Sequence, residues 1–197
     1  EFYFDPVPAS FETVEELDKW QEVAAENSIK AGICIEEQKG LVYSGYFVLG
    51  ANIEYNKVWT PYKAYGDLWA LCYNNAAIWT DNTKTQLKEG AFQEDWGTGK
   101  RGGFKGIFDG QGYYINGMST ESSKPYNAFI ITLGGGTVKN VAFTNMTIGA
   151  SGNSIVDRGD GVLENVYVEV NKIYSAGLDG STIAPTWGLI RSGNGPK

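Results

Sequence analysis

The densest group of charged residues in the second half of the chain is formed by Asp157, Arg158, Asp160 and Glu164. Paired carboxylates can cleave a glycosidic bond, one acting as general acid and the other as base or nucleophile. Carboxylates near an arginine can also serve a lyase, in which calcium binds a uronate and the arginine is the base. If the chain is an enzyme, we expect its catalytic residues to be Asp157, Arg158 and Asp160. A solvated charged corner is the simpler interpretation, and we favour it.

A second group of candidate residues lies in the long, irregular stretch from about residue 60 to residue 103. Aromatic rings stack on the C–H faces of sugars, while neighbouring polar groups select hydroxyls. Long excursions from a rigid scaffold are also where binding tends to reside. We therefore expect carbohydrate binding by the aromatic and polar residues of this stretch. These are Trp96, Tyr62, Tyr65, Asp95 and Arg101.

Other tryptophans of the same region have apolar neighbours, and this composition favours burial. Trp59, Trp69 and Trp79 are expected to form a satellite core that holds the excursion against the rest of the protein.

The segment FKGIFDGQGYYINGM, residues 104–118, combines glycines with an aspartate and could be mistaken for a nucleotide-binding loop. A phosphate loop needs a helix after its glycines, whereas Tyr113, Tyr114 and Ile115 favour a strand. Asp109 could be a catalytic carboxylate or a calcium ligand. We expect instead that its side chain accepts hydrogen bonds from backbone N–H groups in the turn beside Gly110.

Composition argues against several classes of function. The net charge of −7 argues against a nucleic-acid partner, because phosphate binding needs a basic face. The chain has no histidine, which argues against zinc hydrolases and Ser-His or Cys-His catalysis. No apolar run has the length of a membrane span. Cys34 and Cys72 are interpreted as small buried hydrophobes, with a single bridge as the alternative. We expect no metal or cofactor, calcium being the one possible exception.

The first secondary-structure element predicted by the sequence is a helix near the N-terminus. Residues 1–10 contain two prolines and are interpreted as a linker or edge segment. Residues 11–32 predict an amphipathic helix, since Thr13 and Glu16 have the spacing of a capping box. Val14, Leu17, Trp20 and Val23 or Ala24 trace its apolar face, and Gly32 is a plausible stop.

From residue 33 onward the pattern changes to short strands separated by Gly and Asn, and a block of sequence repeats. Segments 110–118, 135–141 and 160–166 align so that Ile115, Val138 and Leu163 coincide. Segments 129–135 and 154–160 also match, and a fourth copy begins with residue 188 aligned to residue 154. Repeats of this length cannot bury their apolar face alone, so they predict a solenoid of stacked strands. A β-sandwich is the competing fold.

Asparagine recurs within the repeat. Asn140 and Asn165 occupy the same place in successive copies, where stacked side chains can hydrogen-bond from one layer to the next.

The order of motifs resembles that of the right-handed parallel β-helix domains of bacterial surface proteins, the pectate-lyase-like superfold and the Gly-Leu-Gly-type repeat proteins. The resemblance is carried by TVEEL, YFVLGANIEY, WTP, FKGIFDGQGYYINGM and AFIITLGGGTVKNV. It implies an all-β, right-handed parallel β-helix over residues 33–197, with the N-terminal helix capping the first coil. The chain departs from the family in having Asn52-Ile53 where Asp-Ile is frequent, and in a long insertion at about 60–103 between the first two rungs.

The fold and the composition together favour a non-catalytic extracellular module, at the cell surface or secreted. We expect it to serve adhesion or carbohydrate and polymer binding within a larger surface or fibre protein. A polysaccharide lyase or glycoside hydrolase on the same scaffold is one alternative. A purely structural subunit is another, in which the rest of a longer parent chain, or another protein chain, completes the unfinished last coil. The expected partner is a glycan or other surface polymer.

Overall fold

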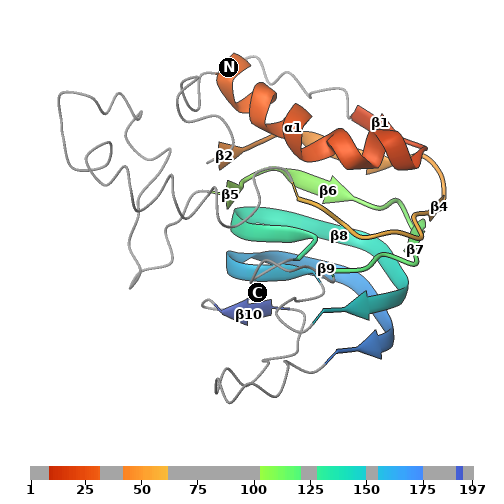
Figure 1. Ribbon diagram of the computed structural model, residues 1–197. Helices are drawn as coiled ribbons and strands as arrows, with labels where there is room; N and C mark the ends of the chain where they lie inside the picture. The colour runs from red at the N-terminus through yellow and green to blue at the C-terminus, as the bar shows by residue number, and fades with distance from the viewer. Residues whose placement is uncertain are drawn as a thin grey trace.

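The computed structural model describes residues 9–31, 42–61, 103–120, 128–149, 155–174 and 190–192. For residues 42–43, 158–160 and 190–192 it describes the backbone alone. Within these ranges the protein consists mostly of strands in a parallel sheet, with a single helix at the N-terminal end (Figure 1).

The helix α1, Val14–Lys30, begins as its sequence predicts. The side chain of Thr13 accepts a hydrogen bond from the backbone N–H of Glu16, and the Glu16 carboxylate accepts one from the backbone N–H of Thr13. Leu17 and Trp20 are fully buried on the face turned to the strands, as predicted. The helix ends at Lys30, and the predicted stop at Gly32 lies outside the described residues.

The sheet contains ten strands in the described residues, and every pairing between them is parallel. They are β1 (Ala9–Phe11), β2 (Val42–Tyr43), β3 (Tyr46–Leu49), β4 (Ile53–Glu54), β5 (Gly103–Phe104), β6 (Ile107–Asp109), β7 (Tyr114–Asn116), β8 (Ile130–Ile148), β9 (Val156–Ile173) and β10 (Ile190–Ser192).

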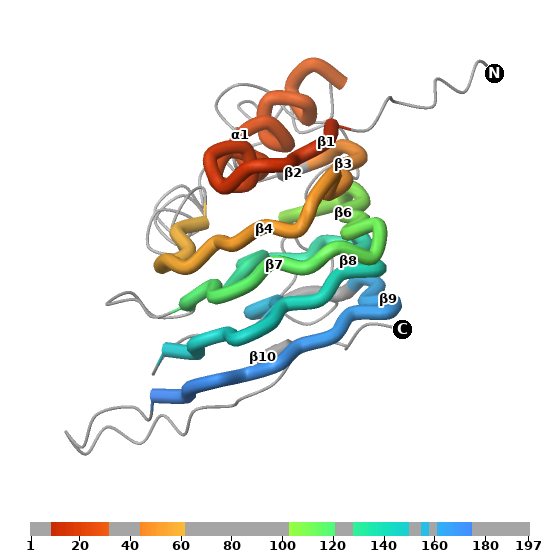
Figure 2. Tube along the Cα trace, turned by 90° about the vertical axis from the view of Figure 1, so that its right-hand side faces the viewer, coloured from red at the N-terminus to blue at the C-terminus, as the bar shows by residue number. Residues whose placement is uncertain are grey.

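These strands are arranged in successive layers. The long strand β8 pairs on one side with β5, β6 and β7, so the three short strands together form one layer. The strands β2, β3 and β4 pair with β5, β6 and β7 and form the layer before it. On its other side β8 pairs with β9 along nearly its whole length, and β10 pairs with the start of β9. Figure 2 shows the layers following one another from α1 to β9.

Two bends recur in successive layers, and each contains a residue with positive φ. Asn140 and Asn165, both at φ 51°, share the first bend with Gln111 at φ 54°. Asn56, Gly117 and Asn145 lie at the second bend with φ values of 46°, 72° and 53°. Glycine and asparagine suit these places because they tolerate the left-handed conformation best.

The register confirms part of the predicted repeat. Val138 pairs with Leu163 and Val141 with Val166, as the alignment of residues 135–141 with residues 160–166 predicts. Ile190 pairs with Val156, which agrees with the predicted start of the fourth copy.

The predicted alignment of Ile115 with Val138 is wrong. Ile115 pairs instead with Phe143, and Phe108 is the residue that pairs with Val138. The two blocks look alike because an alternating strand leads to a left-handed residue in each, Gly117 in one and Asn140 in the other. These residues belong to different bends, so the match in sequence joined positions on different sides of the molecule.

Close approach between layers explains one of the repeated glycines. A Cβ on Gly161 would lie 2.4 Å from the carbonyl oxygen of Gly136 in the preceding layer. Any side chain there would push the two layers apart.

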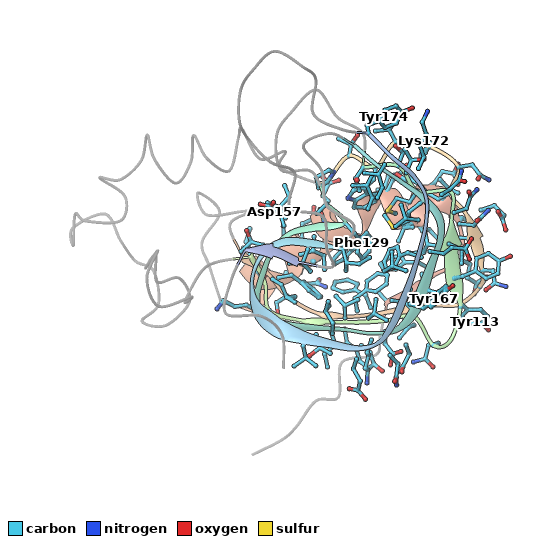
Figure 3. All side chains as sticks on the ribbon, turned by 90° about the horizontal axis from the view of Figure 1, so that it is seen from below. Tyr113, Phe129, Asp157, Tyr167, Lys172 and Tyr174 are labelled. Carbon is cyan, nitrogen blue, oxygen red and sulfur yellow. The ribbon has the colours of Figure 1, made fainter. Side chains whose placement is uncertain are left out.

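The core is aromatic at its centre. Phe129 lies within ring contact of Trp20, Trp59, Phe108 and Phe143, at centroid distances of 5.4, 5.3, 5.1 and 5.0 Å. Figure 3 shows Phe129 inside the curve of the strands. Trp59, predicted to be buried, is 1% exposed and belongs to this main core, where its indole N–H donates to the carbonyl oxygen of Ala128 at 3.0 Å.

Hydrogen bonds join the helix to residues that directly precede or follow strands. The side-chain amide of Gln21 donates to the carbonyl oxygen of Phe129 at 2.8 Å, and the hydroxyl of Tyr55 donates to Asp18 at 2.6 Å. Lys57 also forms an ion pair with Asp18. Burial, together with the Asp18 carboxylate, raises the pKa of Tyr55 far above its usual range, so the phenol remains a donor.

Candidate binding face

The residues predicted to bind carbohydrate lie outside the described residues. Trp96, Tyr62, Tyr65, Asp95 and Arg101 all fall between residues 62 and 102, as do Trp69, Trp79 and Cys72, while Cys34 falls between residues 32 and 41. Their roles therefore stay predictions.

Asp157 is not the solvated residue that the sequence predicts. Its predicted partner is Thr132, but Thr132 pairs with Arg158, and Asp157 lies between Val156 and Arg158 near the start of β9. Its side chain is only 1% exposed. The alignment was displaced by a single position because the register between β8 and β9 shifts after Gly134.

The other two candidate catalytic residues are placed by their backbone only. Arg158 pairs with Thr132 and Asp160 with Gly134. The separation of the Asp157 and Asp160 carboxylates would decide what glycosidic chemistry this pair can do, and it depends on a side chain of Asp160 that is not described. Catalysis by Asp157, Arg158 and Asp160 stays a prediction.

Asp109 holds the first bend together, as its predicted role in the turn requires. Its Oδ1 accepts hydrogen bonds from the backbone N–H of Gln111 at 2.9 Å and from the amide of Asn140 at 3.1 Å. Its Oδ2 lies 3.4 Å from Nζ of Lys139 and 3.5 Å from the hydroxyl of Tyr46. Burial raises the pKa of Asp109, but these donors outweigh burial and hold the pKa below its ordinary value.

The predicted stacking of asparagines is confirmed. Asn165 donates to Oδ1 of Asn140 at 3.1 Å, and Asn140 donates in turn to Asp109. The bend is therefore bound from layer to layer by a chain of side-chain hydrogen bonds. Asp109 serves this chain, and its partners are a sufficient structural reason for a buried carboxylate.

An outward face of β4, β7, β8 and β9 combines tyrosines with polar side chains. We call it the tyrosine face and define it by Glu54, Tyr113, Tyr114, Asn116, Thr144 and Tyr167. Along these strands the alternate residues Ile53, Ile115 and Phe143 are buried in the core, so Glu54, Tyr114, Asn116 and Thr144 point outward. Tyr113 lies at the first bend, directly before β7, and is exposed.

The polar groups of the tyrosine face bind one another across the layers. The hydroxyl of Tyr114 donates to Oε1 of Glu54 at 2.9 Å, and the amide of Asn116 donates to Oε2 at 2.6 Å. The hydroxyl of Thr144 donates to Oδ1 of Asn116 at 3.0 Å. The bonds from Asn116 and Tyr114 hold the pKa of Glu54 below its usual value, while the bond to Glu54 raises the pKa of Tyr114. The face thus carries an ionised acceptor and fixed hydroxyl and amide groups.

Two of its tyrosine rings are open to solvent. Tyr113 is 36% exposed and Tyr167 is 58% exposed. Ala142 pairs with Tyr114 on one side and with Tyr167 on the other, so a small side chain lies between two tyrosines of one column. With neighbouring strands roughly 4.8 Å apart, these tyrosines are about 10 Å apart along the stack. Tyr113 and Tyr167 lie on the same outer side in Figure 3, across the core from Asp157.

Tyr113, Tyr114 and Tyr167 are not among the sequence-predicted binding residues. A usable signal is present in the sequence, because Tyr114 and Tyr167 each alternate with apolar residues that face the core. The alternation places each tyrosine outside, but only the register places both in one column.

Among the described residues no group of three or more His, Cys, Asp or Glu side chains could hold a metal ion. The one described helix, α1, is too short and too polar to cross a membrane.

Comparison with known proteins leaves the family of this chain open. No family model, no curated protein and no solved structure matches it.

Proposed function

We propose that the chain is a right-handed parallel β-helix and acts as a non-catalytic glycan-binding module outside the cell. In this proposal it belongs to a larger surface or fibre protein and serves adhesion, with a surface polysaccharide as its partner. The tyrosine face is the binding surface.

Three features support the parallel β-helix. The strand pairings are all parallel in the described residues, the layers follow chain order, and bends with left-handed residues recur at matching places. A parallel strand returning to the same sheet is right-handed in nearly all proteins, which supports the handedness. The resemblance of the motif order to β-helix surface proteins points the same way.

The observation that carries the glycan proposal is the pair of exposed tyrosines, Tyr113 directly before β7 and Tyr167 on β9, where β9 is paired along its length with β8. Tyrosine offers an apolar ring face and a polar hydroxyl, which suits a sugar with C–H faces and hydroxyl edges. Glu54, Asn116 and Thr144 add hydrogen-bonding groups that the layers hold in place. A rigid surface of this kind loses little entropy on binding.

Binding of the purified protein to an array of plant, bacterial and host glycans tests the proposal. We expect at least one glycan to bind, and Tyr167→Ala to weaken that binding at least tenfold because it removes the most exposed ring. Tyr174→Ala is the matched control, since Tyr174 lies elsewhere on the outer surface in Figure 3, and it should leave binding unchanged.

Trp96→Ala provides the comparison with the site expected from the sequence. Loss of binding in Trp96→Ala with full binding in Tyr167→Ala would move the site from the tyrosine face to the stretch between residues 60 and 103. Failure of every glycan to bind would refute the proposed function.

A further inference from the structure

The inward side chains of β9 repeat those of β8 but are less buried. Five residues of β8 that are at most 3% exposed pair with apolar residues of β9. The pairs are Val138 with Leu163, Val141 with Val166, Phe143 with Val168, Met146 with Val170, and Ile148 with Ile173. In β9 the first three residues are only partly buried, while Val170 and Ile173 are 38% and 49% exposed. Apolar side chains in core positions with this exposure mark a surface that another layer covers.

The backbone of β9 has an open edge along the same segment. Within the described residues β9 pairs with β8 on one side, and on the other side only Val156 and Arg158 pair with β10. The opposite end of the stack is different, because α1 lies across it (Figure 1). An unpaired strand edge is a ready template for pairing with a further strand.

The residues of this open segment are arranged almost symmetrically about Val168. The segment reads LENVYVEVNKI from Leu163 to Ile173. Counting outward from Val168, valine lies opposite valine at 166 and 170, and asparagine opposite asparagine at 165 and 171. One position further out Glu164 lies opposite Lys172, and both of these side chains are exposed; at the ends Leu163 lies opposite Ile173.

We propose that β9 pairs with β9 of a second copy of this chain, antiparallel and about a two-fold axis at Val168. Antiparallel pairing about that point puts each inward residue opposite another inward residue, so the two apolar cores become continuous. It also puts Glu164 of each copy opposite Lys172 of the other, which forms two equivalent pairs of opposite charge.

The second copy fits this surface for two reasons. A symmetric interface uses the same surface on both subunits, which requires that surface to be self-complementary. The order of apolar and charged residues about Val168 has this property. A head-to-tail stack is blocked because α1 occupies the end to which β9 of another copy would have to add. Pairing tail to tail therefore gives a closed dimer, and the tyrosine faces of the two copies meet across the axis.

The mass of the protein in solution, measured by analytical ultracentrifugation over a concentration series, tests the proposal. The wild type should shift from monomer to a species of twice the mass as concentration rises. Glu164→Lys and Lys172→Glu each turn both attractive pairs into repulsive ones and should raise the dissociation constant about tenfold. The double variant with both changes restores opposite charges in the same register and should return to within about threefold of wild type.

Glu15→Lys and Lys19→Glu on α1 are the matched controls, because both side chains lie on the helix at the other end of the stack. They should leave the dimer unchanged and so separate the local pairing from the effect of net charge. Circular dichroism should report an unaltered fold for all of these variants.

A wild type that stays monomeric up to millimolar concentration overturns the proposal. So does a dimer that the single charge changes leave intact, or one that the double variant fails to restore. Glycan binding by a monomer remains possible in every case, so this test and the test of the proposed function fail independently.

Discussion

The strands β8 and β9 run side by side in the same direction and with nearly the same apolar pattern, yet their apolar side chains differ in burial. The strand β8 has a layer on each side, and Val138, Phe143 and Met146 are fully buried. The strand β9 has a full layer on one side only in the described residues, and Val170 and Ile173 are exposed. An apolar side chain in a stacked fold is therefore buried by its neighbouring layers, while its own strand decides only the direction in which it points.

Removal of a core side chain from each strand should show this difference most strongly. Phe143→Ala leaves a cavity between two layers and should lower the free energy of unfolding by about 3 to 5 kcal/mol. Val168→Ala removes a smaller group from a half-covered position and should cost about 1 kcal/mol. Urea unfolding at a low protein concentration, where dimers do not contribute, measures both values. Equal losses for the two variants would contradict the comparison.

Loss of the carboxylate at the first bend should have the next largest effect. Asp109→Asn removes the ion pair with Lys139 and weakens the bonds to Gln111 and Asn140, and it should cost about 1.5 to 3 kcal/mol at pH 7. Because the folded state lowers the pKa of Asp109, its contribution is present above the unfolded pKa and is lost as pH falls through the folded pKa.

The wild type should therefore lose more stability than Asp109→Asn when the pH is lowered from about 6 to about 3. Thermal unfolding at these two pH values measures the effect. Glu164→Gln is the control, since Glu164 is exposed. A difference between wild type and variant that stays constant across this range would show that the charge of Asp109 is not what stabilises the bend.

The smallest difference is expected between the two stacked asparagines. Asn140→Ala removes a donor to Asp109 and an acceptor for Asn165, whereas Asn165→Ala removes one of these bonds only. Both variants place alanine at positive φ, so that cost cancels. Asn140→Ala should be less stable than Asn165→Ala by about 1 kcal/mol in urea unfolding. The reverse order would mean that the bonds between layers contribute less than the strain of each bend.

Local patterns in the sequence correctly predicted the features that depend on residues close together in the chain. The capping box at Thr13 and Glu16 begins α1, and the helical spacing of Leu17 and Trp20 identifies its buried face. The pairing of Val138 with Leu163 and the stacking of Asn165 on Asn140 were also predicted, because uninterrupted β8 and β9 keep one register there.

The predicted alignment of the repeats failed where a residue's pairing partner is set by a bend or a register shift in a neighbouring layer. The block ending at Gly117 was matched to the block ending at Asn140, although Gly117 lies at the other bend. Asp157 was aligned a single position away from its true partner, because the shift after Gly134 leaves no mark in the composition.

The sequence by itself therefore determined the helix, its start, the change to strands after it and the match of residues 135–141 with residues 160–166. These follow from backbone geometry and from the alternation of apolar and polar residues, which act over a few positions. Only the tertiary structure decided that Tyr114, Ala142 and Tyr167 form one column and that Val170 and Ile173 lie exposed. The pairing of distant strands sets both outcomes, and such pairing is a property of the whole stack.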